Sequence, residues 1–180
     1  MWKKTLLILG LTALMVTQVN AQSISLGPLV GYYKTQDSDE GSFIGGVALR
    51  LKLIPIIGVE ASINYRQEKY ANDLLTVRSW PVMITGLIYL LPIFYGAMGI
   101  GWYNTTLDYD QNRLPLLKDD TAQSVGWHFG GGVELPLGTN FKLTGDLRYV
   151  FLNYDFKEIP GSGDMNSNFY VITVGFLFGL

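Results

Sequence analysis

The last twelve residues of the chain, Phe169 to Leu180, alternate between two kinds of side chain. Every second residue from Tyr170 onward is large and apolar, whereas the positions between them are smaller and mixed, as at Thr173 and Gly175. Because successive side chains of a β-strand point to opposite faces, one face of this strand is continuously apolar. Two structures fit such a face: a buried terminal strand of a soluble sheet, or a strand of a membrane barrel whose apolar face meets lipid.

The first 21 residues have the pattern of a secretory signal peptide. Lys3 and Lys4 precede an apolar run from Thr5 to Val16, and Val19-Asn20-Ala21 places small residues where a signal peptidase cleaves. The alternative, an N-terminal membrane anchor, is disfavoured because the run is short for a helix that spans a bilayer. We therefore expect a signal peptide at 1–21 and one domain at 22–180.

Composition excludes several classes of function. The formal net charge is −2, or −4 once the two lysines of the expected signal peptide are removed, and the chain has no basic cluster. A nucleic-acid partner is therefore not expected. The chain has no cysteine, which excludes disulfides, thiol chemistry and cysteine metal sites. The 21 glycines and 13% aromatic residues suit a β-rich protein whose backbones approach closely.

Segments with β character recur between turn signals, and short connections alternate with longer or more polar ones. An antiparallel up-and-down transmembrane barrel has short periplasmic turns and long outer loops, and its even strand number leaves both termini in the periplasm. The pattern therefore predicts an all-β, eight-stranded transmembrane barrel. The expected strands are 23–35, 42–53, 58–70, 74–91, 93–109, 121–137, 141–156 and 169–180, with short connections at 54–57, 92 and 138–140.

Aromatic residues gather at opposite ends of these strands. Amphipathic rings favour the boundary between membrane and water, so aromatic bands at both ends of the strands are expected for a membrane barrel. A soluble β-sandwich has no such boundary, and bands are not expected there. The expected outer band is Tyr32, Tyr33, Tyr65, Trp80, Trp102, Tyr103, Trp127, Tyr149 and Tyr170, and the inner band is Tyr89, Phe94, Tyr95, Phe141, Phe176 and Phe178.

One stretch allows a different interpretation. Residues 81–100 carry no charge and are long enough for a transmembrane helix. Pro81 and Pro92 interrupt the stretch, however, and residues such as Val82 and Ile84 favour strand. We therefore expect two strands joined by a tight apolar turn at Pro92, with the helix as the alternative.

The positions between the apolar ones are polar, and their acids and bases nearly balance. Eight strands close on a space that side chains fill, and buried charges must pair. Lys52 and Glu60, for example, fall opposite each other across the short turn at 54–57. The expected ion-pair network in the barrel interior comprises Arg50, Lys52, Glu60, Arg66, Glu134, Asp146 and Arg148.

Glycines are expected to make room for this network. With a tight turn at 138–140, Gly132 falls opposite Asp146 and Gly130 falls opposite Arg148. The missing side chains would leave space for the long charged ones.

The end of the chain also carries a resemblance. Thr173-x-Gly175-x-x-Phe178-x-Leu180 resembles the C-terminal assembly signal of bacterial outer-membrane barrels, with Leu180 where Phe or Trp is usual. The resemblance implies that the barrel-assembly machinery is a partner.

A family resemblance covers most of the chain after the expected signal peptide. The segments Trp80–Gly86, Tyr95–Tyr103, Gly126–Leu135 and Leu147–Tyr149 resemble, in this order, parts of the outer-membrane protein β-barrel domain family, the OmpA/OmpX-like small barrels. The resemblance implies an eight-stranded barrel in a Gram-negative outer membrane, in a family that is mostly without enzymatic activity. We expect no enzymatic activity and no cofactor. The implied partners are outer-membrane lipid, lipopolysaccharide and an unidentified molecule bound by the outer loops.

His128 is the only histidine, and Ser124 and Glu134 share its side of the strand, which raises the possibility of a hydrolase triad. Barrels that modify lipid A with a His-x-Ser pair would need Ser where this chain has Gly130, and Ser124 and Glu134 lie near opposite rims. No catalytic residue is therefore expected. A lipid A-modifying enzyme and a narrow porin-like channel are the alternatives to a structural or interaction role.

Asp108, Asp110 and Asn112 have the spacing of oxygen ligands, but Arg113 stands where a calcium loop needs glycine. We expect a solvated loop there and no metal site.

Overall fold

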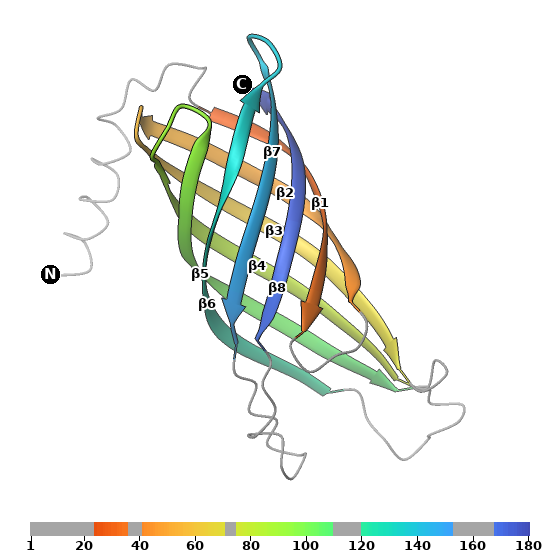
Figure 1. The fold of residues 1–180 in the computed structure, drawn as a ribbon. Helices are drawn as coiled ribbons and strands as arrows, with labels where there is room; N and C mark the ends of the chain where they lie inside the picture. The colour runs from red at the N-terminus through yellow and green to blue at the C-terminus, as the bar shows by residue number, and fades with distance from the viewer. Residues whose placement is uncertain (1–23, 36–40, 71–74, 110–119, 153–167) are drawn as a thin grey trace, which may run out of the picture.

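The computed structural model describes residues 24–35, 41–70, 75–109, 120–152 and 168–180. In them, eight antiparallel strands close into a barrel in which each strand pairs with its sequence neighbours and β8 pairs with β1 (Figure 1). The expected all-β, eight-stranded barrel is therefore confirmed, whereas the expected signal peptide lies outside the described residues. The strands are β1 (Ile24–Thr35), β2 (Ser42–Ile54), β3 (Ile57–Tyr70), β4 (Leu75–Tyr89), β5 (Phe94–Tyr109), β6 (Asp120–Pro136), β7 (Phe141–Phe151) and β8 (Phe169–Gly179).

The strand ends lie close to the expected positions except at the end of β7. That strand ends at Phe151 rather than at 156, and residues 153–156 lie outside the described part of the chain. The helical alternative for 81–100 is wrong, because this stretch divides between β4 and β5. The turn between them is closed by Leu90, whose N–H donates to the carbonyl of Phe94 at 3.1 Å. No helix in the described residues is long and apolar enough to cross a membrane.

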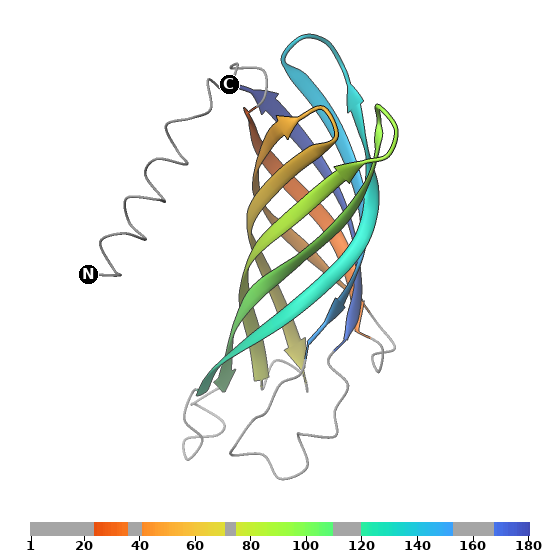
Figure 2. The same ribbon diagram turned by 90° about the vertical axis from the view of Figure 1, so that its left-hand side faces the viewer.

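The short turns β2–β3, β4–β5 and β6–β7 lie at one end of the barrel, together with the start of β1 and the end of β8 (Figures 1 and 2). At this turn end, the N–H of Leu180 donates to the carbonyl of Ile24 at 3.0 Å and ties the last strand to the first. The β6–β7 turn contains Gly138 with φ of 146°, a conformation that residues with a Cβ rarely adopt. The strand ends that flank the longer connections lie at the opposite end, the loop end.

Side chains alternate between an exterior and an interior along the strands. On β8, Tyr170 and Ile172 are each 55% exposed, whereas Val171 and Leu177 are 4% and 0% exposed. The continuously apolar face recognised in the sequence is therefore the outside of the barrel. A soluble sheet would cover that face, so its exposure favours the membrane barrel of the two structures considered.

The expected aromatic bands lie only partly on the exterior. Trp80 and Trp127 toward the loop end and Phe141 at the turn end are exposed. Four other members directly adjoin outward-facing residues, so the alternation of a strand turns them inward. These buried aromatic residues are Tyr33, Tyr89, Tyr95 and Tyr103.

Candidate functional site

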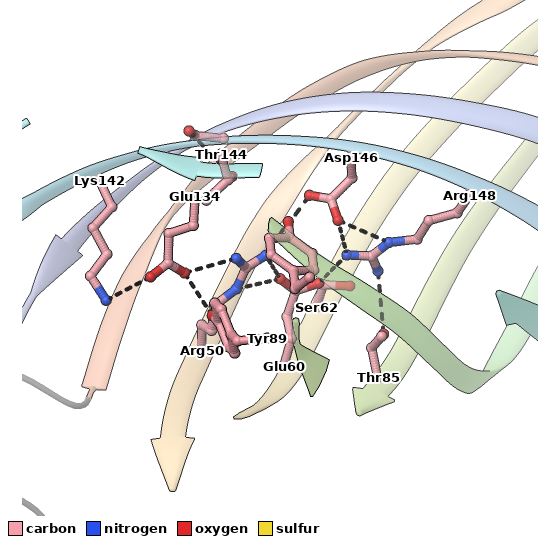
Figure 3. Close-up of polar contacts among 12 residues, drawn as sticks. Arg50, Glu60, Ser62, Thr85, Tyr89, Glu134, Lys142, Thr144, Asp146 and Arg148 are labelled. Carbon is pink, nitrogen blue, oxygen red and sulfur yellow. Dashed lines mark hydrogen bonds and ion pairs between the residues drawn. The ribbon is translucent and has the colours of Figure 1, made fainter. Parts of the chain in front are cut away.

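Charged side chains from four strands meet in the barrel interior (Figure 3). Each occupies an inward position and is at most 5% exposed, so the strand alternation that places apolar residues outside places these charges inside. The five are Arg50 on β2, Glu60 on β3, Glu134 on β6, and Asp146 and Arg148 on β7.

Arg50 lies at the centre of this group. Its Nε donates to Oε2 of Glu60 at 3.0 Å, and its Nη2 is 2.5 Å from the same oxygen. Its Nη1 donates to Oε2 of Glu134 at 3.0 Å, and its Nη2 also donates to the Tyr95 hydroxyl at 3.1 Å. The carboxylate of Asp146 lies 3.8 Å away. One guanidinium thereby contacts three carboxylates on three other strands.

Arg148 approaches Glu60 from the other side. Its Nη2 donates to Oε1 of Glu60 and to Oδ1 of Asp146, both at 2.8 Å. Its Nη1 donates to Oγ1 of Thr85 at 3.2 Å. Bidentate and multiple contacts of this kind suit the fixed fork of donors on arginine.

Glu134 extends the group toward the turn end. Its Oε1 lies 3.2 Å from Nζ of Lys142, and its Oε2 accepts a hydrogen bond from the Tyr89 hydroxyl at 2.8 Å. Lys142 is a member that the expected network lacked. It shares the inward side of β7 with Asp146, so the alternation of the strand was the signal that could have identified it.

With Lys142 included, the group has three cations and three carboxylates. Equal numbers matter because an unpaired charge in a low-dielectric interior is strongly destabilising. We call this group the charged cluster. Its members are Arg50, Lys142, Arg148, Glu60, Glu134 and Asp146.

The register of β2 and β3 corrects one expectation. Arg50, not Lys52, lies opposite Glu60, and Lys52 lies opposite Gly58. The register shifts between Lys52 and Ile54, next to a turn of only two residues. The shift cannot be read from residue spacing, because it depends on the turn geometry.

Lys52 and Arg66 contact aromatic rings instead of joining the charged cluster. Nζ of Lys52 lies 3.9 Å from the centre of the Tyr89 ring. The guanidinium of Arg66, near the loop end, lies 4.7 Å from the ring of Tyr33 and 4.9 Å from that of Phe169. Within the part of the chain that the structure describes, neither cation forms an ion pair, and cation–π contacts take that place.

The expected register of β6 and β7 is observed, with Gly132 opposite Asp146 and Gly130 opposite Arg148. A Cβ at 132 would lie 2.7 Å from the hydroxyl oxygen of Tyr95, and one at 130 would lie 2.1 Å from a backbone carbonyl of β7. Gly132 therefore makes room for a tyrosine that binds the charged cluster. Gly130 permits close approach of the strands.

The residues of the expected assembly signal divide between the two faces of β8. Phe178 and Leu180 lie outside at the turn end and are 41% and 60% exposed. Thr173 and Gly175 belong to the inward positions, and a Cβ at 175 would lie 2.6 Å from Oγ1 of Thr144. The apolar pair of the signal is thus presented on the outer surface of the barrel.

His128 is fully buried, and its Nε2 lies 2.9 Å from Oγ1 of Thr85. Because a guanidinium can only donate, Thr85 accepts from Arg148, and the direction of its hydrogen bond with His128 follows the tautomer of the ring. The structure does not bring the candidate triad together: Ser124 lies opposite Tyr103 across the strands, whereas Glu134 is engaged by the charged cluster.

Metal binding finds no support in the described residues, which contain no group of three His, Cys, Asp or Glu side chains able to hold an ion. Two of the three oxygen-bearing residues considered above as calcium ligands, Asp110 and Asn112, lie outside the described residues.

Comparison with known proteins agrees with this geometry. A family model described as "Outer membrane protein beta-barrel domain" matches residues 5–178. A search of curated proteins found no match.

Solved structures with a similar fold are small outer-membrane or surface proteins. Neisserial surface protein A has a TM-score of 0.64 at 10% identity, over 87% of this chain and 96% of that one. A major outer membrane protein of Thermus thermophilus has a TM-score of 0.62 at 14% identity, over 86% and 97%. Ail, the attachment invasion locus protein of Yersinia pestis, solved with the heparin analogue sucrose octasulfate, has a TM-score of 0.53 at 14% identity, over 87% and 96%.

Proposed function

Because this chain belongs to the outer membrane protein beta-barrel domain family, we propose that it is a non-enzymatic outer-membrane barrel with a closed interior. In this proposal its outer loops give it a structural or interaction role. The observation that carries the proposal is the charged cluster, which crosses the interior and leaves its polar groups bound to one another.

A second layer closes the interior toward the loop end. Phe169 packs edge-on against Tyr33 and Tyr103, with ring centres 5.8 and 6.1 Å apart, and Arg66 lies over Tyr33 and Phe169. The cavity between this aromatic layer and Arg148 has a volume of about 20 Å³. That space holds about one water molecule, so it supports a filled interior over an aqueous channel.

Closure also weakens the case for an enzyme. His128 is fully buried behind these layers, and its polar partner is a threonine bound to Arg148. A lipid substrate outside the barrel would have to reach it through the wall. This arrangement supports a structural role for His128 as a filler at the edge of the charged cluster.

In the proposed orientation, the turn end and both termini face the periplasm, and the loop end faces the exterior. Short turns on the periplasmic side are the rule for bacterial barrels. Outer-membrane lipid and lipopolysaccharide would surround the wall, and the barrel-assembly machinery would recognise Phe178 and Leu180 on the exterior of β8. The loops would carry the interaction role, and Ail, solved in complex with a heparin analogue, shows that a barrel of this fold can bind a ligand.

Conductance tests the closed interior. The purified barrel, shown to be folded by its heat-modifiable migration on a gel, is added to planar bilayers. We expect no stable single-channel currents. Large, stable currents from the pure protein would establish the porin-like alternative.

Lipid A analysis tests the enzyme alternative. Lipid A from cells that express the protein is compared by mass with that from cells that express His128→Ala. We expect identical masses. An acyl chain gained or lost only with the wild-type protein would show that the barrel is a lipid A-modifying enzyme.

Labelling of intact cells tests the orientation. A single cysteine introduced at Asp164, in a long connection, should react with a membrane-impermeant maleimide. One introduced at Thr139, in the β6–β7 turn, should not react until the outer membrane is permeabilised. The reverse pattern would invert the proposed orientation.

A further inference from the structure

A groove of about 530 Å³ opens on the outer surface of the barrel, across β6, β7 and β8. Eight residues line it, and its floor is Gly131, an outward position that has no side chain. Arg148 is the one charged residue among the described residues that line the groove, and its guanidinium points away from the groove to the charged cluster. The mouth of the groove therefore carries no charged side chain from the described residues. The outward-facing lining residues are Phe129, Gly131, Leu147, Tyr149, Phe151 and Tyr170.

The aromatic wall of the groove is fixed by ring contacts. Tyr149 packs edge-on against Phe151 and Tyr170, with ring centres 4.6 and 4.5 Å apart. Phe151 is stacked on Trp127, with centres 3.9 Å apart and planes inclined by only 9°. Rings held in this way lose little freedom when a ligand packs against them, so binding costs less conformational entropy.

We propose that the groove holds one acyl chain of a membrane lipid. The family places this face of the barrel against the hydrocarbon of the outer membrane. The groove lies within the roughly 300–1,000 Å³ of small-molecule sites. A second copy of the chain fits poorly, because a stable protein interface takes about 20–30 residues on each side and eight line this groove.

The lipid would enter from the leaflet on the loop side. Tyr170 is the second residue of β8 and Phe151 the last of β7, so this end of the groove lies near the loop rim, and Leu147 lies deeper in the wall. The hydroxyl group of Tyr170 at this end can donate to an ester carbonyl of the headgroup region. The inference rests on the membrane placement of the barrel and not on which side of the membrane its loops face.

Quenching of Trp127 by brominated lipid tests the inference. Trp127 stacks on the groove wall and is 47% exposed, whereas Trp80, on β4, is 53% exposed and lies away from the groove. Two variants of the barrel at 22–180, which lacks Trp2, each keep one of these tryptophans and carry phenylalanine at the other position and at Trp102. Both are refolded into vesicles of dioleoylphosphatidylcholine, a fraction of which is brominated at the acyl double bonds.

Three substitutions are then compared in each background. Gly131→Val fills the floor, although its Cβ would lie 2.9 Å from the carbonyl of Tyr95. Leu147→Phe covers the groove without crowding the carbonyl of Tyr95. If Gly131→Val does not fold, the result for Leu147→Phe alone tests the inference. Gly45→Val is the matched control, because Gly45 lies on β2 and a Cβ there would meet nothing nearer than 3.9 Å.

We expect both groove substitutions to reduce the quenching of Trp127, and Gly45→Val to leave it unchanged. Quenching of Trp80 should not change in any variant. If Trp127 in the folded Leu147→Phe variant is quenched as strongly as in the parent, the groove holds no lipid chain and the inference is overturned. That result would leave the closed-barrel proposal intact, since conductance tests it separately.

Discussion

Arg50 on β2 and Arg148 on β7 bind different oxygens of one carboxylate, that of Glu60. The two arginines lie on opposite sides of the acid and on strands that are not neighbours in the wall. Glu60 is 1% exposed, so both cations depend on it in a region without bulk water. Because two cations share this carboxylate, we expect the barrel to be sensitive to substitution of Glu60.

We expect Glu60→Gln to lower the free energy of unfolding by about 3–5 kcal/mol, because it removes the charge that two buried guanidinium groups share. Urea titration of the barrel in vesicles, followed by tryptophan fluorescence, measures the change. Lys34→Ala, at an exposed position of β1, is the control and should change stability by less than about 0.5 kcal/mol. Equal stability of Glu60→Gln and wild type would show that the carboxylate is dispensable.

Arg148→Ala should also destabilise the barrel, since it removes the nearer of the two cations at Asp146 and the cation bound to one oxygen of Glu60. The same urea titration applies, with Asp164→Ala, in the long connection before β8, as a nearly neutral comparison. The double variant Glu60→Gln/Arg148→Ala should be less unstable than the sum of the two single changes, because contacting residues do not act additively. Strict additivity would contradict the pairing.

Gly132→Ala should destabilise the barrel by about 1–3 kcal/mol, the usual effect of overpacking. Its Cβ would lie 2.4 Å from the carbonyl of Gly145 and 2.7 Å from the Tyr95 hydroxyl. Gly96→Ala is the matched control, because Gly96 lies on the exterior of β5 and has nothing within 4 Å of an added Cβ. The difference between the two midpoints of urea unfolding is the measured quantity, and no difference would refute the crowding at 132.

Phe178→Ser should reduce the amount of folded barrel in the outer membrane, since it removes an exposed aromatic residue of the proposed assembly signal. Leu180→Phe restores the residue that is usual at this position and should raise the rate of assembly. Pulse labelling, followed by the heat-modifiable band in the outer-membrane fraction, measures both. A change at Phe129, which is equally exterior but lies on β6, serves as the comparison. If Phe178→Ser assembles as well as the wild-type protein, the barrel-assembly machinery recognises a different segment of the chain.

Strand positions could be predicted from the sequence because alternation is a local property. The same alternation placed Glu60, Asp146 and Arg148 inside. It did not reveal which side chains would meet, since Arg50 and Glu134 are 84 residues apart and their contact depends on how the closed barrel sets the stagger of its strands. The place of Lys52 opposite Gly58 was unpredictable for a related reason: one register shift beside a tight turn moves every later pair.

The charged cluster joins strands that the wall itself does not join. Its contacts from Arg50 to Glu134 and from Arg148 to Glu60 span 84 and 88 residues of sequence. Contacts this distant in sequence form only after the chain has closed a long loop, so we expect them to form late in folding. Interactions that are absent from the transition state act mainly on the rate of unfolding. We therefore expect the charged cluster to have little effect on the rate at which the barrel forms and a large effect on how slowly a finished barrel unfolds.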